Sequence, residues 1–237
     1  MVMIGHASIN EKGKVSGGQA GDQTGKEVCT RSWWDGQWNV LLRPSEQYAE
    51  KMAKACEAGC LNDNIGYSQP QRNSLHNNAK LIGYDLSKVG KSECDCSSYM
   101  TVCAIAAGIN ALEYTGNAPT TSTMRRVFKA TNQFAVLTDA KYLRQDKYLK
   151  RGDILVREGH HTVMVLSDGE EAKKDKLPAD LAGADIRTVS AVNLNARASK
   201  MGSKLFILNA GESVKVVEEK DGWCRIEAWV SSSYLVK

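Results

Sequence analysis

The chain has 237 residues, 42% of them hydrophobic, and a formal net charge of +4 at pH 7. This composition is typical of a globular protein of one or two domains. No apolar run approaches the roughly 20 residues that span a bilayer, and the first residues lack a basic segment followed by a long apolar core. The sequence therefore predicts neither a membrane anchor nor a signal peptide.

The N-terminal residues predict irregular structure followed by a tryptophan cluster. Residues 1–32 are rich in glycine and polar residues and show no clear hydrophobic period. Trp33, Trp34 and Trp38 then precede a strand-like segment at 39–42. Such a cluster can stack on sugar rings, but we favour packing against the core, which is the more common use of tryptophan.

Two helices and a strand are predicted beyond this cluster. Ser45 follows Pro44 and is a candidate N-cap, and apolar residues then recur at helical spacing as far as Cys60. Further along, a short capped helix is predicted at 124–129 and an apolar, β-prone segment at 134–137.

Residues 93–108 predict a buried helix with a cysteine in its first turn. Asp95, Ser97 and Ser98 favour a helix start, and apolar residues then recur at helical spacing until a glycine ends the pattern. Cys96 would lie where unpaired backbone N–H groups and the helix dipole favour a thiolate over a thiol. The alternative is a small core cysteine, because buried cysteines are common.

Two strands are predicted beyond residue 150. A turn at 152–153 enters the first, and the second is the apolar run from His160 to Leu166. A histidine at the start of such a strand can face a cysteine at a helix N-terminus and withdraw the thiol proton. Because adjacent strand residues point to opposite faces, only one of His160 and His161 can face Cys96.

These segments resemble a known family. In order and spacing, three segments resemble the NlpC-type papain-like peptidases of peptidoglycan, and above all their phage amidase branch. These segments are Asp95-Cys96-Ser97-Ser98, Gly152-Asp153-Ile154 and His161-Thr162-Val163-Met164-Val165. The resemblance covers roughly residues 45–169 and implies an α+β, papain-like catalytic domain. The segment at 17–28 resembles the opening of a group of gut-phage wall hydrolases, so we assign the N-terminal residues to the same domain.

The resemblance implies roles for individual residues. Cys96 would be the nucleophile and His161 the general base. In the family a polar residue on the strand after the histidine orients it. A charge run follows here, and we choose Asp168 over Glu170 and Asp95 for this role. By position in the family, the residues expected to contact substrate are Tyr67, Asp95, Ser97, Ser98 and His160. A half-buried loop tyrosine is the alternative for Tyr67.

The C-terminal residues change character. The charge run at 170–176 predicts a linker. Short strands with turns at regular spacing follow from Val192 and predict a small all-β barrel. They resemble a bacterial SH3-like wall-binding domain, which implies wall contacts by Asn195, Arg197, Trp223 and Trp229. We therefore expect a catalytic domain at 1–169, a linker at 170–187 and an SH3-like domain at 188–237.

The cysteines do not predict a metal site or a disulfide framework. There are seven, an odd number, and no secretion signal precedes them. Cys56, Cys60, Cys94 and Cys96 can be drawn as a zinc site, but they do not repeat a C-x-x-C pair, and metal there would occupy Cys96. We expect no cofactor.

Together these features predict a phage or prophage endolysin. It would cut an amide bond of the peptidoglycan stem peptide or the muramoyl-L-alanine link, and its modest positive charge suits an anionic wall. One alternative is a non-catalytic wall-binding protein with a decayed papain-like fold, and another is a zinc-dependent amidase using His160, His161 and cysteines. We expect a monomer without nucleic-acid or membrane partners, made in the bacterial cytoplasm and acting on the wall after release.

Overall fold

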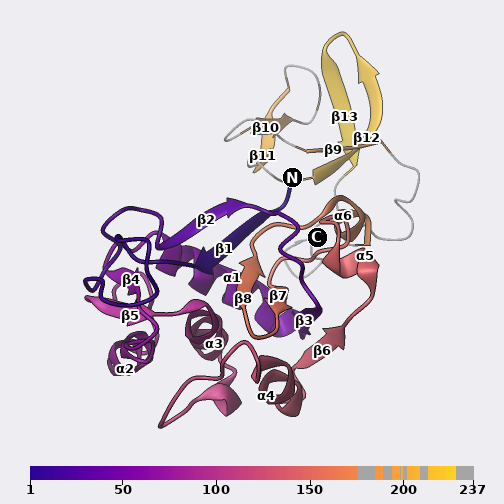
Figure 1. Ribbon diagram of the computed structural model, residues 1–237. Coiled ribbons are helices and arrows are strands. Elements are labelled where there is room, and N and C mark those ends of the chain that lie inside the picture. The colour runs from indigo at the N-terminus through magenta and orange to yellow at the C-terminus, as the bar shows by residue number, and fades with distance from the viewer. Residues whose placement is uncertain (176–184, 189–193, 198, 200–201, 209–212, 228–237) are drawn as a thin grey trace. The chain divides into compact units, whose positions relative to one another are not determined.

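The computed structural model describes residues 1–175, 185–188, 194–197, 199, 202–208 and 213–227. The chain divides into two compact units, Met1–Lys174 and Asp175–Lys237. A mixed arrangement of helices and strands makes up the first unit, and the described elements beyond its last helix are strands (Figure 1).

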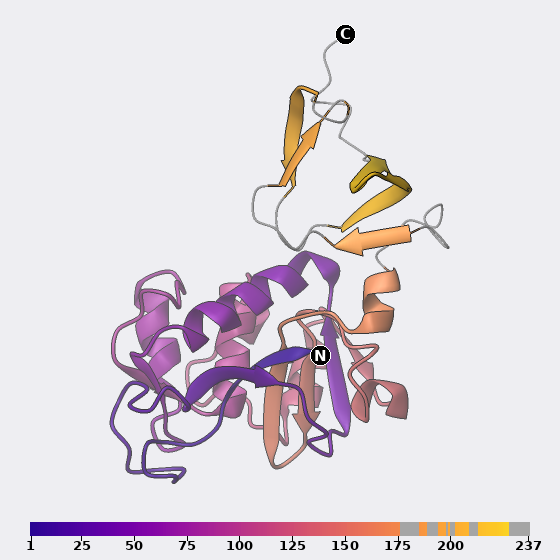
Figure 2. The ribbon, with the colours of Figure 1, turned by 90° about the horizontal axis from the view of Figure 1, so that it is seen from above.

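A six-stranded antiparallel sheet organises the first unit. Its spatial order is β2-β1-β8-β7-β3-β6. β1 therefore lies beside β8 although the two are far apart in sequence, as the indigo and orange strands show in Figure 2. The bounds of the strands are β1 Met3–Ala7, β2 Val28–Ser32, β3 Val40–Pro44, β6 Phe134–Leu137, β7 Ile154–Arg157 and β8 His161–Val165.

The first two strands correct the prediction that residues 1–32 are irregular. β1 is buried from Ile4 to Ala7, because β2 and β8 pair with its two edges and its side chains lie in the cores on both faces of the sheet. A strand that is buried on both faces lacks the alternation of apolar and polar residues that marks a half-exposed strand. The prediction is wrong at 3–7 and 28–32, whereas the loop between them consists of turns and bends.

Helices α1 (Glu46–Cys60) and α3 (Cys96–Ala106) pack on one face of this sheet, and the helices predicted at 45–60, from Cys96 and at 124–129 are confirmed. Ser45 precedes α1, but its hydroxyl donates to the carbonyl oxygen of Gln133 and does not cap the helix. The remaining elements of the unit are β4 Ile65–Tyr67, α2 Ser74–Leu81, β5 Ser92–Cys94, η1 Asn110–Leu112, α4 Met124–Ala130 and α5 Ala140–Leu143.

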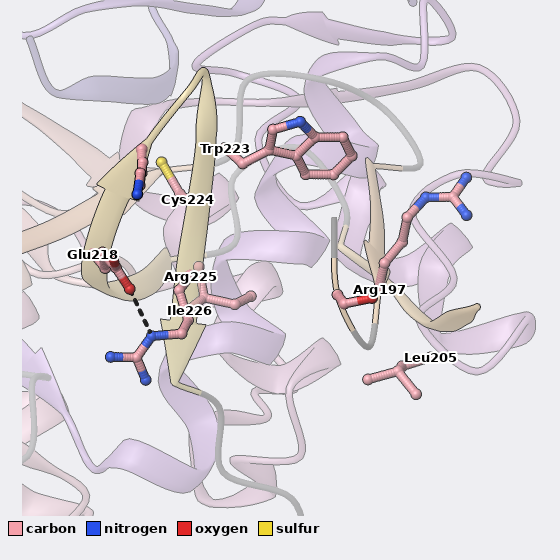
Figure 3. A pocket seen from close by; sticks show the side chains of 9 residues that line it. Arg197, Leu205, Glu218, Trp223, Cys224, Arg225 and Ile226 are labelled. Atoms are coloured by element: carbon pink, nitrogen blue, oxygen red, sulfur yellow. Dashed lines mark hydrogen bonds and ion pairs between the residues drawn. The ribbon is translucent and has the colours of Figure 1, made fainter. Parts of the chain in front are cut away.

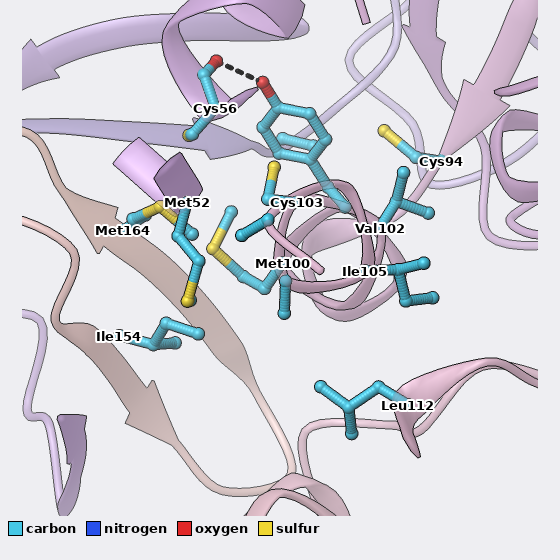
Figure 4. Close-up of a cluster of buried hydrophobic side chains, with 14 of the residues drawn as sticks. Met52, Cys56, Cys94, Met100, Val102, Cys103, Ile105, Leu112, Ile154 and Met164 are labelled. Atoms are coloured by element: carbon cyan, nitrogen blue, oxygen red, sulfur yellow. Dashed lines mark hydrogen bonds between the residues drawn. The ribbon is translucent and has the colours of Figure 1, made fainter. Parts of the chain in front are cut away.

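Each face of the sheet covers a hydrophobic core. Between the sheet and helices α1 and α3 lie the fully buried side chains of Cys56, Met100, Cys103 and Met164 (Figure 4). Full burial of a methionine side chain contributes roughly 1.5–3 kcal/mol. Alternate residues of the same strands point to the opposite face, where Trp38 is 1% exposed in a second core. This confirms that the tryptophan cluster packs against the core.

The predicted turn at 152–153 joins the sheet to α1. Gly152 has a φ of +93°, and a Cβ there would lie 2.6 Å from the carbonyl oxygen of Ala49, so only glycine fits. The buried carboxylate of Asp153 accepts hydrogen bonds of 2.8 and 2.7 Å from the Arg43 guanidinium on β3. The glycine and aspartate of this motif therefore stabilise the packing of β7.

The first unit extends a few residues beyond the end expected at 169. Part of the charge run forms helix α6 (Glu170–Asp175), in which Ala172 is 1% exposed. The backbone N–H of Glu171 donates to the carbonyl oxygen of Lys147 at 2.9 Å. The start of the expected linker is therefore packed and hydrogen-bonded into the first unit.

The second unit is a small β region, as predicted. Its described strands form a three-stranded sheet, β13-β12-β9, and a two-stranded sheet, β10-β11. Asp221 and Gly222 have φ values of 53° and 75° and make a tight turn between β12 and β13. The bounds are β9 Asp185–Thr188, β10 Leu194–Arg197, β11 Lys204–Leu208, β12 Ser213–Lys220 and β13 Trp223–Glu227.

Candidate functional site

The nucleophile candidate lies at a firmly fixed helix start. The Asp95 carboxylate accepts the backbone N–H of Ser98 at 2.7 Å, and the Ser98 hydroxyl accepts the backbone N–H of Asp95 at 2.8 Å. This reciprocal capping box fixes the first turn of α3. Arg72 forms a 2.7 Å ion pair with Asp95, which holds the cap in place. Cys96 is the first residue of α3 and is 6% exposed.

The sulfur of Cys96 lies beside the start of β8. Burial, followed by the negative charge of Asp95, raises the pKa of Cys96 to about 12. The backbone N–H groups of Thr162 and Ser97 and the Arg72 guanidinium lower this pKa, but by less. The helix N-terminus alone therefore does not make the thiolate that its position favours. Because Thr162 directly follows His161, the structure brings the cysteine to the beginning of the histidine strand.

His161 meets a second histidine that sequence reasoning missed. In the antiparallel pairing of β1 with β8, Gly5 lies opposite Met164. The next residue, His6, therefore lies diagonally across from His161 on the same face of the sheet. His6 Nδ1 and His161 Nε2 are 3.2 Å apart and share a hydrogen bond. A lone histidine in the apolar run at 2–7 is the one sequence signal, and it does not show which strand lies beside it.

The hydrogen bonds continue beyond His6. Its Nε2 lies 3.6 Å from Sγ of Cys29 on β2, and that thiol donates to the carbonyl oxygen of Lys26 at 3.5 Å. When the thiol donates to the Lys26 carbonyl, Sγ can accept from His6 Nε2–H, and His6 Nδ1 can then accept from His161 Nε2–H. This order of donors leaves a lone pair on Nδ1 of a neutral His161.

Both imidazoles are held in the neutral form. Burial, then the charges of His161 and Arg31, lowers the pKa of His6 to about 3. Burial, then the charge of Arg31, lowers the pKa of His161 to about 4, with Asp95 acting in the opposite direction. A neutral imidazole can accept a proton at neutral pH, but the lowered pKa also makes it a weaker base than an ordinary histidine.

Tryptophan rings and a cavity surround His161. The Trp38 ring stacks on His161 with the centroids 6.3 Å apart, and Trp34 lies at the same centroid distance in a tilted arrangement. The Arg31 guanidinium lies 4.3 Å above the centre of the Trp34 ring. Beside them is a cavity of about 320 Å³, lined by Trp34, Asp35, Gly36, Gln37, Trp38, Arg157 and His161. Its aromatic and hydrogen-bonding walls suit a polar substrate that contains a ring.

Other predicted contact residues lie around Cys96. Burial, and next the charge of Cys96, raises the pKa of Tyr67, whose phenol oxygen accepts a hydrogen bond of 3.3 Å from Gln69. The Ser97 hydroxyl donates to Asp95 at 3.1 Å and accepts from Arg72 at 2.8 Å. The serines of the motif are thus engaged in holding the helix start, and Arg72 is a further member of this network that the sequence did not indicate.

The structure does not bring Asp168 to His161. A strand rises about 3.3 Å per residue, and Asp168 lies beyond the opposite end of β8, where its carboxylate accepts the backbone N–H of Arg151 at 2.8 Å. His6 occupies the position beside His161 that we expected Asp168 to fill. His160 is exposed in the turn that precedes β8.

Two of the four predicted wall-binding residues of the second unit line one cavity. Asn195 and Arg197 lie on β10, and Trp223, which is 38% exposed, begins β13. Arg197 and Trp223 line a cavity of about 420 Å³ (Figure 3). Asn195 is not among its lining residues, and Trp229 lies outside the described residues. The other lining residues are Ser199, Leu205, Glu218, Lys220, Cys224, Arg225 and Ile226.

Three absences apply to the part of the chain that the structure describes. It contains no group of three or more His, Cys, Asp or Glu side chains arranged to hold a metal ion. Its seven cysteines, all of which lie in this part, are free thiols. No described helix has the length and apolar character needed to cross a bilayer.

Comparison with known proteins identifies the class. The endolysin-like domain model matches residues 4–172, which is most of the chain, and a bacterial SH3 domain model matches residues 190–236. The chain therefore belongs to the endolysin-like domain family, and its two matches together support a cell-wall hydrolase of the endolysin type. No curated protein and no solved structure matches it.

Proposed function

We propose that this chain is a peptidoglycan hydrolase with a papain-like, NlpC-type catalytic domain that cuts an amide bond by thiol catalysis. Cys96 is the nucleophile, His161 the general base and His6 the residue that orients the base. The scissile bond lies in the stem peptide or at its link to muramic acid. The family match at 4–172 covers all three residues.

One observation carries this proposal. His161 shares a hydrogen bond of 3.2 Å with His6, while the backbone N–H of the next residue, Thr162, acts on the sulfur of Cys96. A nucleophile, a base and a group that orients the base are the parts that thiol catalysis requires. Here they come from α3, β8 and β1, which lie next to one another in space.

The donor order defines the first step. His161 Nδ1 accepts the thiol proton of Cys96 as the sulfur attacks the carbonyl carbon of the substrate. His161 then gives this proton to the leaving amine as the C–N bond breaks and a thioester remains. Water next attacks the thioester, His161 takes its proton, and the carboxylic acid leaves while the proton returns to the sulfur. Backbone N–H groups of the first turn of α3 stabilise the oxyanion in both halves.

Because the Cys96 thiol is buried, its deprotonation depends on His161 in this proposal. Because the pKa of Cys96 is raised to about 12, the sulfur is protonated in the free enzyme at neutral pH. Deprotonation therefore accompanies attack on the substrate and does not precede it. In this proposal the neutral His161, which stacks on Trp38 and shares a hydrogen bond with His6, accepts that proton.

The second unit supplies wall binding in this proposal. An exposed tryptophan and an arginine beside one cavity can stack on and hydrogen-bond to a carbohydrate or peptide of the wall. Tethering this unit to the hydrolase raises the local concentration of the enzyme at its polymer. Trp223→Ala should weaken pull-down by intact walls and leave hydrolysis of small soluble fragments unchanged.

Digestion of purified peptidoglycan tests the function and separates it from the alternatives. Mass spectrometry of the products should show new amino and carboxyl groups from a single type of amide bond. A thiol-blocking reagent should abolish their formation, whereas a zinc-selective chelator that leaves calcium in place should not. Loss of activity with the chelator and retention with the thiol reagent would favour the zinc-dependent amidase. Wall binding without any product would favour the decayed, non-catalytic fold.

A further inference from the structure

Two glutamates outside the proposed catalytic residues are buried without a hydrogen-bond partner. Glu27 is 0% exposed and Glu93 is 1% exposed. None of their four carboxylate oxygens has a hydrogen bond of good geometry within the described part of the chain, although the backbone of Gln23 and the carboxylate of Glu11 lie close enough to affect the pKa of Glu27. Burying an ionised carboxylate without a partner costs several kcal/mol or more, so such groups are normally paired or coordinate a metal.

The two carboxylates and a third one influence one another directly. Burial, then the negative charge of Asp22 and the carboxylate of Glu11, raises the pKa of Glu27 to about 7, while the backbone N–H of Gln23 acts in the opposite direction. Burial, then the charges of Glu27 and Glu11, raises the pKa of Glu93 to about 7. Like charges in a shared, poorly solvated space raise the free energy of the folded state unless a proton or a cation compensates them.

The backbone places these side chains where the β1–β2 loop crosses the strand pair β4–β5. Gly66 of β4 pairs with Glu93 of β5. A Cβ on Gly66 would lie 2.3 Å from the carbonyl oxygen of Gly21 in the loop, so the loop backbone packs directly on this pair. Glu27 ends the same loop immediately before β2.

Little positive charge is available to compensate this cluster. The described ion pair of the cluster joins Lys12 to Glu11 at 4.0 Å, and the Lys12 ammonium is 60% exposed and donates to the carbonyl oxygen of Gly17. This contact lies at the rim and does not reach the oxygens of Glu27 or Glu93, which stay without a partner among the described residues.

We propose that Glu27 and Glu93 bind a calcium ion that joins the β1–β2 loop to the strand leading into Cys96. Two carboxylates are the protein core of the site, and backbone carbonyl groups and water complete it. An irregular loop with dehydrated carboxylates fits calcium, which accepts six to eight oxygen ligands in flexible geometry, better than magnesium, which keeps most of its water.

The ion would act on both halves of the proposed catalytic site. The loop connects β1, which holds His6, with β2, which holds Cys29. Glu93 precedes the Asp95 cap of α3 by two residues. An ion bound between them would therefore fix the strand with His6 relative to the helix with Cys96.

Calorimetric titration of the metal-stripped full chain with CaCl₂, with MgCl₂ for comparison, tests the site. We expect Glu27→Gln and Glu93→Gln each to weaken the binding of one calcium ion by at least about 10-fold, because each removes a charged oxygen donor. Glu11→Gln, which removes a neighbouring negative charge, should weaken it less. Glu46→Gln changes an exposed glutamate on α1 and should leave binding unchanged.

Thermal unfolding of the same proteins gives an independent readout. At about 100 times the dissociation constant, calcium should raise the unfolding temperature of the unchanged first unit by roughly 5–10 °C. Without metal, Glu27→Gln should be at least as stable as the parent chain, because it removes a repulsive charge. If calcium neither binds nor shifts unfolding, or acts equally on Glu27→Gln, the proposal is wrong and the pair shares a proton. Neither readout uses hydrolysis, so this result stands apart from the proposed function.

Discussion

Helix α3 carries two buried cysteines whose surroundings differ. Cys96, at its first position, lies among backbone N–H groups, Asp95 and Arg72, beside the strand of His161. Cys103, two turns later, is 0% exposed in the main core and its thiol contacts that of Cys56 (Figure 4). Burial raises the pKa of both thiols.

The difference shows that burial does not decide which cysteine reacts. Both thiols are protonated at neutral pH, so a shifted pKa alone would not tell them apart. What separates them is the presence of a base and of donors for a developing negative charge. Cys96 has both near it in the proposed site, whereas Cys103 is surrounded by methionine, tyrosine and cysteine side chains.

The largest expected effect is on the nucleophile itself. Cys96→Ser should lower peptidoglycan turnover by at least about 10⁴-fold with an unchanged circular dichroism spectrum, because a serine hydroxyl cannot become a comparable nucleophile here. Cys103→Ser is the matched control on the same helix. It should lower the free energy of unfolding by roughly 1–3 kcal/mol through a buried hydroxyl and keep turnover per folded molecule. Equal losses of turnover in both variants would remove the distinction between the two cysteines.

The next effect concerns the base. His161→Ala should lower turnover by roughly 10²–10⁴-fold, the usual range for general acid–base catalysis. His160→Ala, an exposed residue one position earlier, should leave turnover near that of the parent chain. If His160→Ala has the larger effect, the histidine strand is shifted by one residue from the register described above.

A smaller effect is expected at the residue that orients the base. His6→Ala should lower kcat roughly 10–100-fold with little change in KM, as is usual for groups that orient a functional histidine. His6→Asn should restore part of the loss, because its amide can accept from His161 Nε2–H. Asp168→Asn serves as the comparison, and a larger loss there than at His6 would reinstate Asp168 in this role.

The smallest effect is a change in pH dependence. His161 acts as a base only when neutral, and its pKa is lowered to about 4, so kcat/KM should fall on acidification near pH 4–5 and not near 6.5. Arg31→Gln removes a positive charge that lowers this pKa and should move the acid limb to higher pH by less than about one unit. A limb that stays at 6.5 in both proteins would show that His161 is not buried as described.

Local sequence was sufficient for the elements whose signals lie within a few residues. The capping residues before Cys96, the helical spacing to Cys60 and the apolar run from His161 fixed helices and strands that the structure confirms. The turn at 221–222 was equally predictable, because Asp-Gly is a strong hairpin signal. The same signals placed the candidate nucleophile and base correctly on a helix start and a strand start.

Only the tertiary structure decided what lies beside that base. The sequence directed attention to the segment after β8, where Asp168 stands, but β1 pairs with β8 and brings His6 to His161 from the other end of the chain. The pairing of distant strands is decided by tertiary contacts. A five-residue strand that is buried on both faces also carries no periodic pattern that would reveal it. For the same reason the buried glutamates at 27 and 93 became visible as neighbours only after the β1–β2 loop had folded back over β4 and β5.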